Sequence, residues 1–438
     1  MERWTASEAN QLRELLGLRP EAFARRLTIH KRTVLRWRDG DTDPAAAIQE
    51  DLDNLLSEAA RKLAHWLALD QLDQLDQLAK MHRRDLLRLL AASSNIPVGG
   101  IDLWNGLLTQ VSTTSLESLE EITTVLASLY RTSPPHLLLS PVTGHLEKAS
   151  ALLGAAMKPS QRRRLESVVA DVSVFVGVLS MHTGKLAQAR AHLWTAEKMA
   201  QQAGNMALLP LVYAEQALLD YYSQAPTKDN DDPRLRIERL EDADQLARRY
   251  APAIVQMIIS TQLAEDKAAA KVITLGSVAA AKDAYDADKA LERSGLALAK
   301  AQGEGPVGTG FCSSAGVYSG WDQGRLEGFR GAVELSLGRT SAIDTITTSL
   351  ELKTVPSVRA YGLIDLAIAL IGQKRPEEAC DRLVEAHAIG LDRGSAVILH
   401  TVFSARTLMP PKWNTLRCVR QLDDRLGLRG QLNRVWWS

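Results

Sequence analysis

Small residues recur at fixed spacing along most of this 438-residue sequence, and this pattern limits its fold more than any other feature. The clearest copy consists of Val176, Gly177, Gly184, Leu186, Ala189, Leu193 and Ala196. Spacings of three, four and seven residues place such positions on single helix faces. Glycine and alanine let two helices cross closely, and larger side chains fill the space between crossings. The pattern predicts a helical hairpin that turns at Gly184.

Two further segments carry the same pattern. One contains Phe329, Gly331, Leu337, Gly338, Arg339 and Ala342. The other contains Leu366, Ala367, Leu370, Lys374, Glu378, Ala379, Leu383 and Ala386, with Lys374 at the turn. A hairpin with these offsets and a period of about 34 residues is typical of a tetratricopeptide repeat. Such hairpins cannot bury their apolar faces alone, so we expect a stacked α-solenoid with a concave surface that binds peptides or protein segments.

The composition favours an all-α protein without a strong overall charge. Aromatic residues make up 5% of the chain, and 52 basic residues balance 52 acidic ones, so any affinity for nucleic acid must come from a local patch. The most apolar window, residues 168–181, is interrupted by Asp171, and the N-terminus lacks the apolar run of a signal peptide. We therefore expect a cytoplasmic protein that does not enter a membrane.

The first sixty residues predict a small helical domain. Thr5 and Glu8 have the spacing of a capping box, and Pro20 fits the first turn of a second helix. Pro44 is expected to open a later helix through Ile48. Between residues 19 and 38 the sequence has seven basic residues and one acidic residue, a local charge of +6. This segment supplies the local patch that DNA binding requires.

Residues 24–38 resemble the helix-turn-helix of the Xre/Cro-like repressors. Ala24 occupies the small position where two helices cross, and Ile29, Val34 and Trp37 occupy the buried positions five, ten and thirteen residues later. The resemblance covers residues 5–58. It implies a four- to five-helix domain that binds double-stranded DNA.

Two positions depart from the pattern of that family. Thr28 occupies the turn position at which glycine is usual, and a β-branched residue is strained at positive φ. His30 occupies the position of the usual serine cap, and histidine is a poor N-cap. Both departures lie in the turn, whereas the buried positions follow the pattern.

The residues expected to face DNA lie opposite Val34 and Trp37 on the second helix of this motif. They are Lys31, Arg32, Leu35, Arg36 and Arg38. We expect Lys31, Arg32 and Arg36 to contact base edges, because a bidentate arginine distinguishes guanine. The expected phosphate contacts are Thr33, Arg25, Arg26 and Arg38. The alternative is a solvated basic face that binds nothing, or one adapted to bind protein.

Residues 57–92 contain neither glycine nor proline and predict a helical connector. Its leucines Leu69, Leu72, Leu75 and Leu78 recur every third residue, a spacing that drifts around a helix and disfavours a long coiled coil. The connector could join two protomers of a homodimer or pack on its own second domain. Glycine and proline between residues 95 and 100 suggest a boundary, which gives domains at 1–60, 61–95 and 96–438.

The order of these domains is similar to that of the RRNPP peptide-sensing regulators, and especially of their actinobacterial relatives. The segments 320–339 and 365–380 carry this likeness, with Gly320-Trp321-Asp322 and Pro376-Glu377-Glu378-Ala379-Cys380 among their residues. The resemblance implies a homodimeric transcription regulator of quorum-sensing type, whose DNA binding responds to a signalling peptide or small molecule in the repeat groove.

Four residues are candidates for the ligand groove. Repeat register favours Asp171 and Tyr361, and helix face favours Tyr213 and Gln216. The alternative for each of the four is an ordinary surface or core position.

Other motifs do not indicate catalysis, a cofactor or a metal. Residues 303–308 match G-x-G-x-x-G, but the expected helix before them and Pro306 within them disfavour a nucleotide site. The nine histidines lack metal-ligand spacing, and Cys312, Cys380 and Cys418 lack C-x-x-C spacing and are expected to be core thiols. The alternatives to a regulator are a protein-interaction scaffold and, with less support, an enzyme that uses the loop near residue 303.

Overall fold

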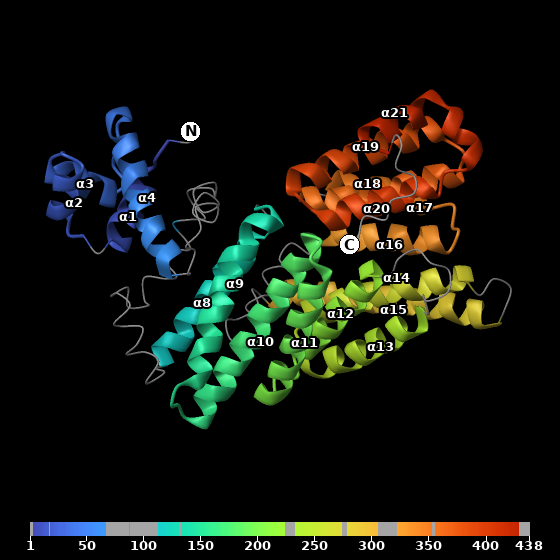
Figure 1. Cartoon of the computed structure of the whole chain (residues 1–438), viewed down its shortest axis with the longest axis horizontal. Helices are drawn as coiled ribbons and strands as arrows, with labels where there is room; N and C mark the ends of the chain where they lie inside the picture. The colour runs from blue at the N-terminus through green and yellow to red at the C-terminus, as the bar shows by residue number, and fades with distance from the viewer. Residues whose placement is uncertain are drawn as a thin grey trace.

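The computed structural model is helical throughout the part of the chain that it describes, which confirms the all-α fold class (Figure 1). It describes residues 3–16, 18–66, 87, 113–130, 133–223, 233–273, 278–304, 322–352 and 355–428. Most of the connector, including Leu69, Leu72, Leu75 and Leu78, lies outside these residues, as do Cys312 and residues 305–308 of the glycine-rich motif.

The N-terminal helices form a group of their own in Figure 1. They are α1 (Ala6–Leu15), α2 (Pro20–Arg26), α3 (Lys31–Arg38), the 3-10 turn η1 (Ala46–Ile48) and α4 (Gln49–Trp66). The capping box forms, since Thr5 Oγ1 accepts from the Glu8 amide at 3.3 Å and Glu8 Oε2 accepts from the Thr5 amide at 3.0 Å. The helix expected after Pro44 begins later, because the Gln49 side chain donates to the Pro44 carbonyl and a 3-10 turn comes first.

The remaining helices stack as antiparallel pairs. Their bounds are α8 (Thr113–Leu129), α9 (Pro135–Ala151), η2 (Leu152–Gly154), α10 (Pro159–His182), α11 (Leu186–Ala203), α12 (Leu209–Ser223), α13 (Pro233–Tyr250), α14 (Ala253–Ile273), α15 (Val278–Glu304), α16 (Gln323–Ser336), α17 (Ala342–Leu352), α18 (Pro356–Gly372), α19 (Pro376–Arg393), α20 (Ala396–Thr407), η4 (Pro411–Thr415) and α21 (Arg417–Arg425). The architecture is the helical repeat stack that the sequence predicts.

The three repeats recognised in the sequence are the pairs α10/α11, α16/α17 and α18/α19. Each pair turns through a left-handed residue at the same position, Gly184 at φ 78°, Gly338 at φ 70° and Lys374 at φ 62°. A lysine in this left-handed conformation is strained, whereas a glycine is not. The turn geometry of the repeat is therefore set by the packing of the two helices.

Close crossing of the paired helices depends on the small residues. A Cβ added at Gly177 would lie 2.9 Å from Leu193 Cδ2, and one added at Gly331 would collide with Ile346. Ala367 holds the matching position in α18, seven residues before the turn, and is fully buried. These side chains explain the spacing of small residues.

The even-numbered helices form an inner layer. Each of α10, α12, α14, α16, α18 and α20 contacts the next, and α20 also contacts α10. The odd-numbered helices from α11 to α19 each pack between two consecutive even-numbered ones. The superhelix therefore closes on itself, which the repeat pattern alone does not predict.

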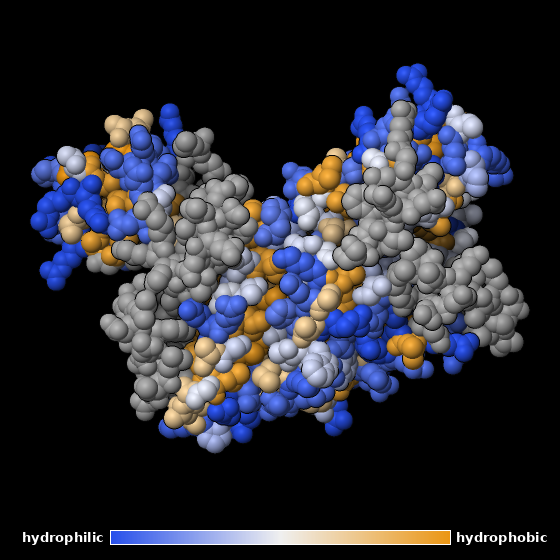
Figure 2. All heavy atoms as spheres, viewed as in Figure 1, coloured by the Kyte–Doolittle hydropathy of each residue, from blue (hydrophilic) through white to orange (hydrophobic). Residues whose placement is uncertain are grey.

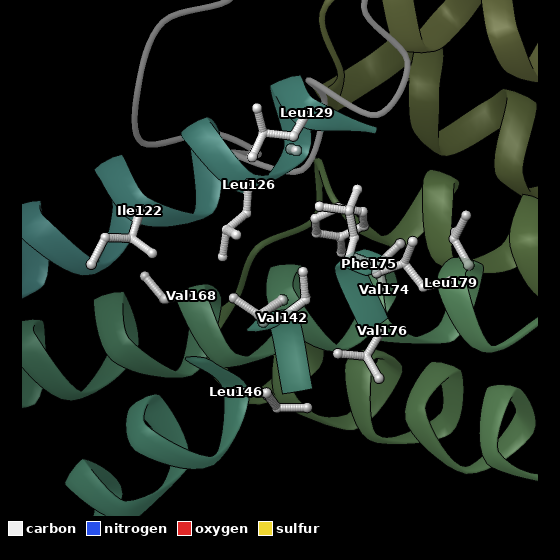
Figure 3. Packing of buried hydrophobic residues seen from close by; sticks show 14 of the residues in the cluster. Ile122, Leu126, Leu129, Val142, Leu146, Val168, Val174, Phe175, Val176 and Leu179 are labelled. Carbon is white, nitrogen blue, oxygen red and sulfur yellow. The ribbon is translucent and has the colours of Figure 1, made fainter. Parts of the chain in front are cut away.

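Helices α8, α9 and α10 enclose an apolar core. Figure 3 shows Ile122 and Leu126 of α8 facing Val142 of α9 and Val168 and Phe175 of α10. One described helix, α10, is long and apolar enough to cross a membrane, but 83% of its apolar window is buried inside the protein. Such burial is typical of a central core helix.

Candidate nucleic-acid interface

The connection between α2 and α3 has a defined geometry. Thr28 adopts φ 53°, and the amide of Ile29 donates to the carbonyl of Ala24 at 3.0 Å, which reverses the chain after α2. His30 Nδ1 then accepts from the Arg32 amide at 3.2 Å and caps α3. Thr28 thus adopts a left-handed conformation that favours glycine, and His30 caps the helix despite its low preference as an N-cap.

The buried side of this unit has the residues that the sequence places there. Ala24, Val34 and Trp37 are buried, and Ile29 is half-buried. Sequence reasoning missed Trp4, which is also buried and whose Nε1 donates to Asp53 Oδ1 at 2.8 Å. A lone tryptophan near a terminus gives no periodic signal, so only the fold reveals that it joins the N-terminus to α4.

The opposite side of α2 and α3 carries the basic residues. Figure 2 shows hydrophilic residues along much of the outer edge of the N-terminal helices. The exposed cations are Arg25, Arg26, Lys31, Arg32, Arg36 and Arg38. Thr33 and Leu35 are half-buried and lie at the margin of this face. The DNA-contact candidates are therefore all at least partly exposed on α2 and α3, and we call the six exposed cations the basic face.

Ion pairs divide the basic face into two groups. Lys31 Nζ lies 2.5 Å from Glu21 Oε1, Arg26 Nη1 lies 3.2 Å from Glu58 Oε2, and Arg38 Nε lies 2.8 Å from Asp39 Oδ1. The hydrogen bond from Lys31 lowers the pKa of Glu21, and that from Arg38 lowers the pKa of Asp39.

The second group consists of Arg25, Arg32 and Arg36, which make no ion pair with any residue in the described ranges. Their guanidinium groups can meet an anion without first separating from a carboxylate. They are therefore the strongest candidates for contacts to phosphates or bases.

Two of the four groove candidates, Tyr213 and Gln216, lie apart from Tyr361. Asp171 is buried on α10, and Tyr361 lies on α18 beside Tyr222. Gln216 Nε2 donates to Glu197 Oε2 of α11 at 2.8 Å, and burial, followed by the charge of Glu197, raises the pKa of Tyr213. Tyr213 and Gln216 therefore face the outer helix α11, away from Tyr361.

Other polar and aromatic side chains converge between the inner helices and were missed from sequence. We call this group the inner polar cluster; its members are Tyr130, Glu215, Tyr222, Glu265, Tyr361 and Asp365. Desolvation by the surrounding helices, with smaller effects of Asp365 and Asp266, raises the pKa of Glu265, although its side chain is still exposed to solvent. Part of this cluster is visible in the sequence, because Glu215 and Tyr222 are seven residues apart and share a helix face.

Metal-binding groups of three or more histidine, cysteine or acidic residues are absent from the described part of the chain. Cys380 is buried and Cys418 is half-buried, both as free thiols, and burial and its neighbour Cys418 raise the pKa of Cys380 to about 12. A thiol with a raised pKa is a weak nucleophile. These two cysteines are core residues, as the sequence predicts.

Comparison with models of known protein families finds no match, and comparison with curated protein sequences finds none either. Among solved structures, the chain is similar to a signal transduction ATPase with numerous domains from Pyrococcus horikoshii that has a tetratricopeptide repeat sensor. The two share 12% identity, with a TM-score of 0.30, over 97% of this chain and 75% of the other. The helical repeat architecture described above follows from the helices of this chain itself.

Proposed function

We propose that this chain is a cytoplasmic, sequence-specific DNA-binding transcription regulator of the Xre/Cro-like type. The observation that carries the proposal is the α2–α3 unit, in which Thr28 and His30 complete the turn and the basic face lies opposite the buried Val34 and Trp37. A helix presented in this way fits the major groove of double-stranded DNA.

The ion pairs assign different roles to the basic residues. Arg32 and Arg36, on the outer side of α3, are suited to bidentate contacts with guanine, and Arg25 to a phosphate. Lys31, Arg26 and Arg38 already pair with acidic residues, and loss or weakening of these pairs offsets part of the affinity that a DNA contact adds. Thr33 and Leu35 border the contact.

The repeat domain is proposed to bind a signalling peptide or another small ligand and to change DNA binding in response. The inner polar cluster supports this part, because side chains from helices far apart in sequence meet there and Tyr361 is one of them. We further propose a homodimer, since paired recognition helices one DNA turn apart read a two-fold operator.

The test is selection of duplexes from a random pool by the full-length protein, followed by affinity measurement at several salt concentrations. An Arg32→Ala, Arg36→Ala variant should lose about 1 to 3 kcal/mol of binding free energy for each base contact removed. The control is Arg26→Ala, Arg38→Ala, which changes the charge equally but removes cations that already have partners.

Two results would count against the proposal. Equal affinity of both double variants and the natural protein would show that α3 does not bind DNA. Failure to enrich any sequence, with only non-specific affinity, would favour a protein-interaction scaffold.

A further inference from the structure

Two cysteines of the chain meet where α21 packs on α19, at one end of the helical stack (Figure 1). Cys380 lies in the first half of α19, and Cys418 is the second residue of α21. Both are free thiols, they share a hydrogen bond, and both pack in the apolar core of this end of the stack. Two sulfur atoms in contact need only a small side-chain movement to reach the distance of a disulfide bond.

The fold keeps α21 in place on both sides of the cysteine pair. Val419 and Leu422 bury the apolar side of α21 in the same core. The buried Arg406 of α20 holds Asp423 through two hydrogen bonds, Nε to Oδ1 at 2.7 Å and Nη2 to Oδ2 at 2.9 Å. The two thiols therefore face each other in the folded protein without having to search for one another, which favours a reaction between them.

The two thiols differ in their access to solvent. Cys380 is 3% exposed, whereas Cys418 is half-buried. Burial, followed by the neighbouring Cys418, raises the pKa of Cys380 to about 12, so little of it is thiolate at neutral pH. A reagent from solution therefore meets Cys418 first, and Cys380 reacts second and slowly.

We propose that Cys380 and Cys418 form a reversible disulfide bond that fastens α21 to α19, with a low-molecular-weight disulfide as the oxidant. The thiolate of Cys418 attacks one sulfur of this molecule, and a mixed disulfide forms as the first small thiol leaves. The thiolate of Cys380 then attacks Sγ of Cys418, and the second small thiol leaves. Overall the two protein thiols lose two electrons and two protons, and the small disulfide takes up both to become two thiols.

The apolar surroundings favour the disulfide over the thiolates. A disulfide carries no charge and suits an apolar core, whereas burial disfavours a thiolate. Reduction begins at the more accessible sulfur, that of Cys418, and must expel Cys380 as a thiolate. Because a thiol of high pKa is a poor leaving group, the bond should be broken slowly once it has formed.

The disulfide would close a loop that contains the rest of α19, all of α20 and the turn η4. Helix α20 belongs to the inner layer and contacts both α18 and α10. Closing such a loop stabilises a protein chiefly by restricting its unfolded chain. Oxidation would therefore stabilise this end of the repeat domain, and disulfides of this kind in a cytosolic protein are usually redox-sensing. The proposal concerns the repeat domain alone and does not depend on DNA binding.

The experiment uses the full-length protein with Cys312→Ser, because Cys312 lies outside the described residues and its removal leaves only the two thiols in question. This protein is equilibrated with mixtures of reduced and oxidised glutathione, both folded and in urea, and the products are identified by mass spectrometry. The disulfide appears as a loss of two hydrogens, and a mixed disulfide as an added glutathione. Thermal unfolding of both forms is followed by circular dichroism. The control adds Cys418→Ser, which cannot form the bond.

The equilibrium constant for the Cys380–Cys418 bond should be about tenfold or more larger in the folded protein than in urea, because a bond that stabilises the fold is stabilised by it. The oxidised protein should unfold at a temperature higher by about 5 °C or more, and dithiothreitol should reverse the change. The control should unfold at the same temperature in both mixtures. Glutathione held on Cys418 without a Cys380–Cys418 bond would overturn the proposal. So would an equal or smaller constant in the folded protein, because the fold would then keep the sulfurs apart.

Discussion

Acidification should destabilise the core between α8, α9 and α10 through His145. This side chain has no exposed surface, and its Nε2 lies 2.9 Å from Thr123 Oγ1. The Thr123 hydroxyl donates to the Leu119 carbonyl at 2.8 Å, so the imidazole is the donor toward Thr123. Burial lowers the pKa of His145 from 6.5 to about 4. The imidazole of His145 is therefore neutral in the folded protein.

The sign of the effect follows from these two pKa values. Between pH 6.5 and pH 4 the unfolded chain binds a proton that the folded chain does not, so stability falls as the pH falls through this window. From pH 7 to pH 5 the loss amounts to about 2 kcal/mol for this one side chain. Below pH 4 both states bind the proton and the loss grows no further.

The measurement compares the natural protein with His145→Gln, whose amide can still donate to Thr123 but does not titrate. The free energy of unfolding is obtained from urea titrations at pH 7 and pH 5. The natural protein should lose about 2 kcal/mol more than the variant. All other titrating side chains are the same in both proteins, so their contributions cancel in this difference.

His192→Gln serves as the control, because His192 is half-buried on the surface helix α11. Burial lowers the pKa of His192, in the same direction as for His145, but its ring keeps contact with water. Its substitution should therefore remove a smaller part of the pH dependence. An equal loss of stability in the natural protein and His145→Gln would refute the reasoning.

Four further substitutions have defined outcomes. Gly331→Ala should lower the unfolding free energy by about 1 to 3 kcal/mol, because its Cβ would strike α17. Gly295→Ala, at a position with open space in α15, should raise the unfolding free energy by about 0.5 to 1 kcal/mol. Thermal unfolding of the two variants measures both changes. Thr28→Gly should relieve about 1 to 2 kcal/mol of left-handed strain and stabilise the N-terminal helices against protease, and faster cleavage would contradict this. Glu21→Gln should free Lys31 and strengthen DNA binding most at low salt, which titrations at two ionic strengths would reveal.

The sequence by itself determined the local structure of this protein. The recurring small residues define the hairpins, and the positions of Gly184 and Lys374 define their turns, because both are set by contacts between neighbouring helices. The burial of Val34 and Trp37 was also predictable, since a helix has one apolar side and the spacing identifies it. Local periodicity contains all of this information.

The tertiary structure alone decided which polar residues meet. Helix α12 places Glu215 inward and Gln216 outward, although the two are adjacent, because the inward direction depends on how α12 packs between α10 and α14. Arg393 of α19 donates to the carbonyl of Tyr130 across 263 positions, and such a pairing depends on the accumulated rotation of every repeat between them. Each repeat is rotated slightly relative to the one before it, and these rotations add up along the stack. Whether the ring of inner helices closes therefore depends on all of the repeats together.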